Sequence, residues 1–99
     1  MSQFAYSSDQ MAYLNTMAEQ YIWWKSPQEA LTQPKRVIAQ VMEIGGTDDV
    51  IELLKKFQPA ELANVLLEAE QGWFTPKSWT FWHAYCELDT PPLPERSFS

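Results

Sequence analysis

Cysteine and glycine are scarce in this chain of 99 residues, and both shortages limit what it can be. Cys86 is the only cysteine, so no internal disulfide can form and CxxC-type zinc sites are absent. Three glycines are too few for an all-β fold with many tight turns. No apolar run approaches the roughly 20 residues that cross a bilayer, and the first ten residues lack the basic and apolar regions of a signal peptide. We therefore expect a soluble, cytoplasmic protein without a membrane segment.

Positive charge is also in short supply. Seven Lys and Arg residues stand against thirteen Asp and Glu residues, which gives a formal net charge of −6. A phosphate backbone is repelled by such a surface unless the cations gather on one face. Here they form two isolated pairs, Lys35-Arg36 and Lys55-Lys56, with single cations elsewhere. We do not expect nucleic acid to be the main partner.

The familiar catalytic motifs are missing: the chain contains no Walker A loop, GxGxxG, GxSxG or HExxH. His83, Cys86 and Glu87 fall within about one helical turn, but there is no further His or Cys to complete a zinc site or to activate a thiol. Asp48 and Asp49 are adjacent, so on a helix their carboxylates point about 100° apart and do not converge. The sequence therefore predicts no enzyme, no metal and no cofactor.

Helix-start patterns recur along the chain, and apolar residues follow them at intervals of three and four. No period-2 alternation or Asn-Gly hairpin indicates a strand. The expected ends are near Trp24 for the first helix and Gly72 for the fifth, with Gly45-Gly46 ending the third in the left-handed conformation. We predict an all-α fold: a single compact domain of five or six short helices over residues 1–88, with starts near Ser7, Ser26, Pro34, Thr47, Pro59 and Thr75.

Six of the fourteen aromatic residues lie in the stretch GWFTPKSWTFWHAY, at 72–85. Phe74 precedes the helix cap Thr75 and Trp79 follows it by four, which is the spacing of a hydrophobic staple. We expect most of these aromatic residues, together with Trp23, to belong to the core. The residues predicted to be largely buried are Leu14, Ile22, Val37, Val41, Leu54, Leu66, Trp79 and Trp82.

Residues 89–99 carry three prolines and cannot continue a helix, so we expect an extended tail, partly polyproline II. The tail has two apolar anchors, Leu93 and Phe98. An extended segment with such anchors either packs across its own helices or lies in a groove on a partner. Both possibilities stay open at the level of the sequence.

Several aromatic-rich motifs resemble those of a family of small, mostly uncharacterised bacterial proteins. The matching stretches are 21–30 (YIWWKSPQEA), 37–42 (VIAQVM), 72–79 (GWFTPKSW), 81–83 (FWH) and 93–98 (LPERSF). Together they cover about residues 21–98. Members are often encoded beside nucleotidyltransferases of the abortive-infection type, an arrangement typical of toxin–antitoxin pairs. Family members often end in several arginines, whereas this chain has only Arg96 there.

The resemblance implies an antitoxin-like binding partner, because this chain lacks the Gly-Ser and paired-aspartate motif of a nucleotidyltransferase itself. Five tryptophans exceed what so small a core buries completely, and tryptophan is enriched at interface hot spots. We therefore predict a protein-binding accessory module that neutralises a nucleotidyltransferase-type toxin. Its candidate partner-binding residues are Trp24, Trp73, Leu93, Pro94, Arg96 and Phe98.

Two other functions remain in competition. A DNA-binding regulator could use residues 34–44 and 48–57 as a helix-turn-helix, although the second helix would then offer Asp48 and Asp49 to the groove. A self-associating structural domain could close its surplus aromatic residues in a homodimer. Binding to its own promoter would identify the first, and a stable dimer the second.

Overall fold

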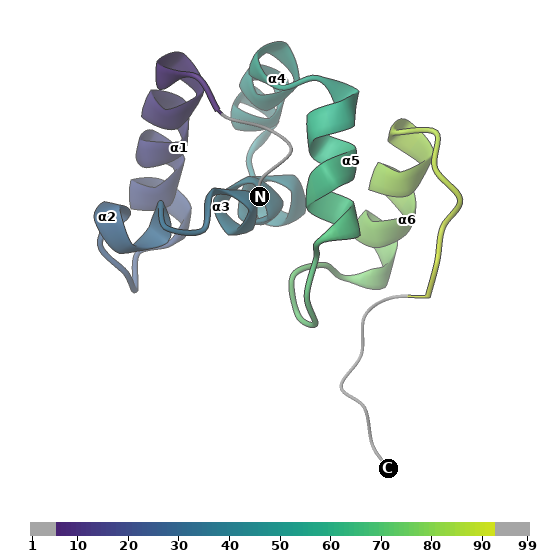
Figure 1. The fold of residues 1–99 in the computed structure, drawn as a ribbon. Helices are drawn as coiled ribbons and strands as arrows, with labels where there is room; N and C mark the ends of the chain where they lie inside the picture. Colours follow the sequence, from purple (N-terminus) through teal and green to yellow (C-terminus); the bar gives the residue numbers. More distant parts are fainter. Residues whose placement is uncertain (1–5, 93–99) are drawn as a thin grey trace.

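Helices account for all regular secondary structure in residues 6–92, the part of the chain that the computed structural model describes. Figure 1 shows them gathered into one compact globule. The prediction of an all-α fold is confirmed. In chain order the helices are α1 (Ser8–Tyr21), α2 (Pro27–Ala30), α3 (Pro34–Ile44), α4 (Thr47–Lys56), α5 (Pro59–Leu67) and α6 (Pro76–Tyr85).

The helix starts lie where local capping chemistry predicts them. Before α1, the Gln10 N–H donates to Ser7 Oγ at 3.1 Å, and the Ser7 N–H donates to Gln10 Oε1 at 2.9 Å. Ser26 and Glu29 form the same reciprocal capping box at the start of α2. A proline occupies the first turn of α2, α3, α5 and α6, where its missing N–H costs nothing. Each of these starts is set by a few consecutive residues.

The helix ends differ more from the prediction. α1 ends at Tyr21 instead of Trp24, and α5 ends at Leu67 instead of Gly72. The backbone leaves the helix at Ile22, the C-cap of α1, where φ is −126° and ψ is 62°. After α5 the Ala69 N–H donates to the Leu66 carbonyl at 3.3 Å, a tighter turn that takes the chain out of the helix.

The glycine pair between α3 and α4 acts in a way that the sequence did not indicate. Gly45 has φ −63° and ψ 145°, so the expected left-handed conformation is wrong. A Cβ at this position would lie 2.5 Å from the Val41 carbonyl oxygen, so the close approach requires glycine there. Gly46, not Thr47, is the N-cap of α4.

The core is built around α3, which packs against each of the other five helices. In Figure 1 α1 and α2 lie on one side of α3, and α5 and α6 lie on the other. Seven of the eight residues predicted to be largely buried are buried. Leu54 is only partly buried, because the neighbouring Leu53 takes the core position on α4. Trp23 is not a core residue: 79% of it is exposed.

The last helix packs through Trp79 and Trp82, whereas Phe81 and Tyr85 are exposed, so only half of the six aromatic residues in 72–85 are buried instead of most. The rings of Phe74 and Trp79 lie 5.8 Å apart between centroids, which confirms the hydrophobic staple. The Trp82 indole N–H donates to the Met42 carbonyl at 3.0 Å and so ties α6 to α3. Beyond α6 the chain turns back, and the Trp79 indole N–H donates to the Pro91 carbonyl at 2.8 Å. The backbone at Pro91 therefore lies against α6, while the residues of 89–92 remain exposed.

Candidate functional site

Two adjacent tryptophans stand exposed at the connection between α1 and α2. Trp23 is 79% exposed and Trp24 is 51% exposed, and their rings meet edge to face with centroids 5.6 Å apart. They leave the core because α1 ends at Tyr21, just before them. Large exposed aromatic side chains of this kind are typical of binding surfaces.

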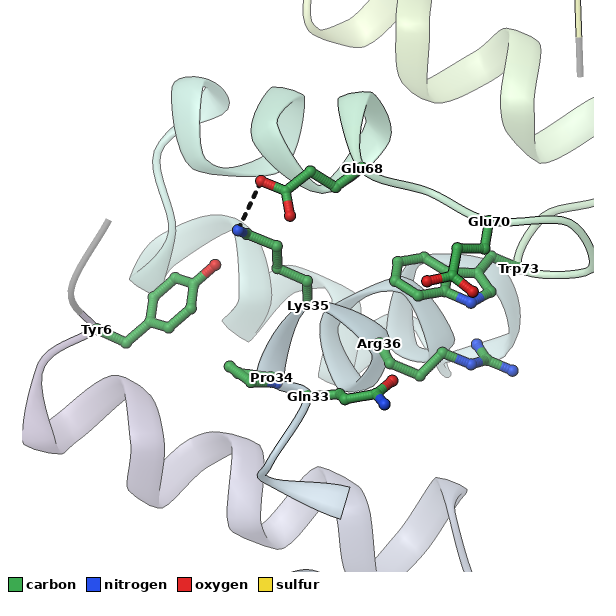
Figure 2. Close-up of a pocket in the computed structure, with 8 residues that line it drawn as sticks. All are labelled: Tyr6, Gln33, Pro34, Lys35, Arg36, Glu68, Glu70 and Trp73. Atoms are coloured by element: carbon green, nitrogen blue, oxygen red, sulfur yellow. Dashed lines mark hydrogen bonds and ion pairs between the residues drawn. The ribbon is translucent and has the colours of Figure 1, made fainter. Parts of the chain in front are cut away.

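A cavity of about 300 Å³ lies between the start of α3 and the connection from α5 to α6. Figure 2 shows Tyr6 and Trp73 at opposite sides of it, with Lys35 between them. Lys35 Nζ forms an ion pair with Glu68 Oε2 at 2.8 Å. The complete lining consists of Tyr6, Gln33, Pro34, Lys35, Arg36, Glu68, Glu70 and Trp73.

Arg36, like Glu70, is a charged residue of this cavity that forms no salt bridge among residues 6–92. Its guanidinium carbon lies 5.4 Å from the centroid of the Trp73 ring, in a cation–π contact. Arg36 Nη1 donates to Gln40 Oε1 at 3.1 Å. Within residues 6–92 the guanidinium forms no salt bridge with a carboxylate. Burial lowers the pKa of Arg36, and the negative charge of Glu70 acts in the opposite direction.

A second, smaller hollow of about 70 Å³ lies between Trp24 and Arg36. Gln33 and Arg36 line both hollows, so the two adjoin at these residues. Trp24 and Trp73, which are far apart in the sequence, thus lie on one surface. We call it the Trp24–Trp73 surface and define it by Trp24, Lys25, Gln33, Arg36 and Trp73.

Tyr6 contributes a buried polar atom to the larger cavity. Its hydroxyl is screened from solvent and has no hydrogen-bond partner in the described part of the chain. Burial raises the pKa of Tyr6 to about 12, with smaller contributions from the negative charges of Glu61 and Glu68. Its ring meets that of Phe57 edge to face, 5.8 Å away, which anchors the start of the described chain on the core.

The remaining predicted site residues fall into two groups. Leu93, Pro94, Arg96 and Phe98 lie outside the described residues. His83 and Cys86, considered above for metal or thiol chemistry, both lie within them.

His83 is 2% exposed, and its Nδ1–H donates to the Trp79 carbonyl at 2.7 Å. Cys86 is partly buried, and burial raises the pKa of its thiol. Among residues 6–92 no three His, Cys, Asp or Glu side chains are placed to hold a metal ion together.

Sequence reasoning named Trp24 and Trp73 but missed Arg36 and Gln33. In the sequence Lys35-Arg36 reads as an isolated basic pair, and nothing local distinguishes the two cations. Only the fold separates them, by pairing Lys35 with Glu68 and placing Arg36 over Trp73. The proline just before them, which starts α3, was the one available indication that both lie at a helix start.

Comparison with models of protein families, with curated proteins and with solved structures finds no match to this chain. None of the helices between residues 6 and 92 has the length and apolar character required to span a membrane.

Proposed function

We propose that this chain is a protein-binding accessory module that holds a cognate enzyme, of the nucleotidyltransferase toxin type, in a neutralised complex. The observation that supports the proposal best is the Trp24–Trp73 surface. It brings two tryptophans and an arginine to two adjoining hollows. Tryptophan and arginine are the residues most enriched at protein–protein hot spots.

The charge of the chain supports the choice of an enzyme that acts on nucleotides or nucleic acid. Such enzymes carry basic clefts, and a module with net charge −6 complements a basic cleft electrostatically. Complementary charge raises the rate of association more than the final affinity. The resemblance to a family encoded beside nucleotidyltransferases points to the same class of partner.

A DNA-binding function has less support. In a helix-turn-helix reading α4 would be the recognition helix, and its first turn carries Asp48 and Asp49. Asp49 is already engaged, since its carboxylate accepts hydrogen bonds from Tyr21 and Gln20. A helix that begins with two carboxylates would meet the DNA groove with like charge.

The test is co-expression of the full chain with a candidate toxin of the nucleotidyltransferase type encoded next to it, followed by size-exclusion chromatography. We expect one co-eluting peak and loss of the toxin's activity in the complex. Trp24→Ala should weaken the complex by about tenfold or more, as hot-spot tryptophans do. Phe81→Ala is the matched control, because Phe81 is an exposed aromatic residue on α6 that lines neither hollow.

Two separate peaks at micromolar concentrations of both proteins would refute the proposal. Sedimentation of the isolated chain addresses self-association. A stable homodimer that protects Trp24 from solvent would favour the self-associating domain instead.

A further inference from the structure

We infer that the Trp24–Trp73 surface receives a carboxylate from an extended segment of its protein partner, with apolar side chains of that segment on either side. The inference rests on the proposed function and names the chemistry of the partner segment. It starts from Arg36, which stands at the junction of the two hollows.

Among the residues described, Arg36 has free N–H donors and an unpaired positive charge with which it can bind an anion. The guanidinium has five N–H groups, of which one at Nη1 donates to Gln40, and its central carbon lies over the Trp73 ring. The group is partly desolvated and forms no ion pair within residues 6–92. A carboxylate would offset the lost hydration, and its two oxygens match the planar fork of arginine.

Local charge favours the same ligand. The chain is acidic overall, yet the charged residues that line the smaller hollow, among those described, are Lys25 and Arg36. In the larger cavity Lys35 neutralises Glu68, while Glu70 keeps its negative charge near Trp73. Glu70 and the net charge of −6 repel any anion, but they repel a run of phosphates more than one carboxylate, so a single carboxylate beside Lys25 and Arg36 is favoured.

The aromatic rings on either side of Arg36 indicate which side chains the partner segment carries next to its carboxylate. Trp24 bounds the smaller hollow, and Trp73 and Tyr6 bound the larger cavity, so apolar surface lies on both sides of Arg36. In an extended segment alternate side chains share one face. A partner segment of the pattern apolar-x-acidic-x-apolar would place its carboxylate at Arg36 and one apolar side chain in each hollow.

The test uses the full chain, labelled with ¹⁵N, and two synthetic peptides that differ in one group. The peptides are acetyl-Leu-Ser-Glu-Ser-Leu-amide and its counterpart with Gln in place of Glu. We expect the Glu peptide to shift the indole N–H signals of Trp24 and Trp73 and the Nε–H signal of Arg36. The Gln peptide should bind about tenfold more weakly or worse, because it loses a charge-assisted hydrogen bond.

Variants separate a direct role of Arg36 from general effects of charge. Arg36→Gln should weaken binding of the Glu peptide about tenfold, whereas Arg36→Lys should retain part of it. Lys55→Gln is the control, since Lys55 is exposed and lines neither of the two hollows. Trp24→Ala, at an exposed position, supplies a second variant should Arg36→Gln unfold the chain.

Equal binding of the two peptides, or no shift up to about 5 mM peptide, would overturn the inference. So would inorganic phosphate or a single-stranded oligonucleotide that displaces the Glu peptide, because the site would then belong to a phosphate ligand. A toxin that co-elutes equally well with wild type and with Arg36→Gln would leave the proposed function standing and the inference wrong. Selective binding of the Glu peptide without any toxin complex would support the carboxylate site and refute the proposed function.

Discussion

The Tyr21 hydroxyl lies 2.5 Å from Asp49 Oδ2 and joins the last residue of α1 to the first turn of α4. The Tyr21 hydroxyl oxygen also accepts a hydrogen bond from the Gly46 N–H at 2.9 Å, so it satisfies a backbone donor at the N-cap of α4. Tyr13 makes a second connection, with its hydroxyl donating to the Asp49 carbonyl at 2.7 Å. Two tyrosines of α1 thus fix the position at which α4 begins.

Removing the Tyr21 hydroxyl should therefore cost more than a surface hydrogen bond. We expect Tyr21→Phe to lower the free energy of unfolding by about 1–2 kcal/mol, since it deletes a bond to a carboxylate and leaves the Gly46 N–H without its acceptor. Urea unfolding followed by circular dichroism measures the change. Thr16→Val, which removes an exposed hydroxyl on α1, is the control and should have a much smaller effect. Equal losses for the two variants would contradict the role given to Tyr21.

The tyrosines also predict how stability depends on pH. Burial raises the pKa of Tyr6 to about 12 and raises that of Tyr13 further, whereas an unfolded tyrosine titrates near about 10. Above about pH 10 the unfolded chain loses protons that the folded chain keeps, so the free energy of unfolding should fall as the pH rises towards about 12. Below about pH 10 these groups are neutral in both states and their contribution is complete.

Urea unfolding from about pH 8 to about pH 12 checks this dependence. Tyr13→Phe removes one of the titrating groups, so its stability should decline less steeply over the alkaline range. Comparing the two slopes cancels the contribution of the lysines, which both chains share. Parallel curves for the variant and the wild type would show that Tyr13 is not protected from ionisation.

The fold was largely predictable because the helix starts depend on neighbouring residues. The capping boxes of Ser7 and Ser26 are complete within four residues, and both form as expected. The helix ends and the exposure of Trp23 depend on how distant segments pack, which no local pattern contains. For the same reason the sequence predicted Trp24 as a candidate site residue but did not reveal that Arg36 would lie beside it.

Gly45 illustrates a requirement that only the structure explains. Its backbone angles are open to any residue, but a Cβ would lie 2.5 Å from the Val41 carbonyl oxygen and 2.9 Å from Val41 Cγ1. We expect Gly45→Ala to destabilise the protein by about 1–3 kcal/mol, because the end of α3 must shift. Gly46→Ala is the control, since the nearest atom to its added Cβ, the Tyr21 hydroxyl oxygen, is 3.7 Å away. Thermal unfolding of both variants distinguishes them, and similar melting temperatures would contradict the steric explanation.

At Glu87 the backbone adopts a conformation that favours glycine, although the residue there is not glycine. It has φ 58° at the end of α6, where the Glu87 N–H donates to the Ala84 carbonyl and the Leu88 N–H to the His83 carbonyl. These two bonds form a Schellman motif, whose left-handed residue is usually glycine. We expect Glu87→Gly to stabilise the protein by about 0.5–1 kcal/mol as strain is relieved.

Asp89→Gly is the matched control for Glu87→Gly. It removes the same charge nearby, but Asp89 does not have a positive φ, so no stabilisation should follow. Chemical unfolding of both variants at one pH makes the comparison. An equal gain for both would attribute the effect to charge and not to backbone conformation.

The last prediction concerns the segment after α6, for which the sequence left two roles open. The bond from the Trp79 indole to the Pro91 carbonyl holds the backbone at Pro91 against the domain itself. A chain ending at Leu88 should therefore be less stable than one ending at Pro92, by about 1 kcal/mol, since the truncation deletes one hydrogen bond and uncovers the edge of Trp79. Thermal and urea unfolding of the two chains isolate the contribution of residues 89–92, and equal stability would contradict it. The chain ending at Pro92 then tests residues 93–99 separately: if it binds the toxin like the full chain, then Leu93, Pro94, Arg96 and Phe98 take no part in the complex. If binding is lost while stability matches that of the full chain, the segment acts on the partner, because only a contact made in the complex can change affinity and leave folding unaffected.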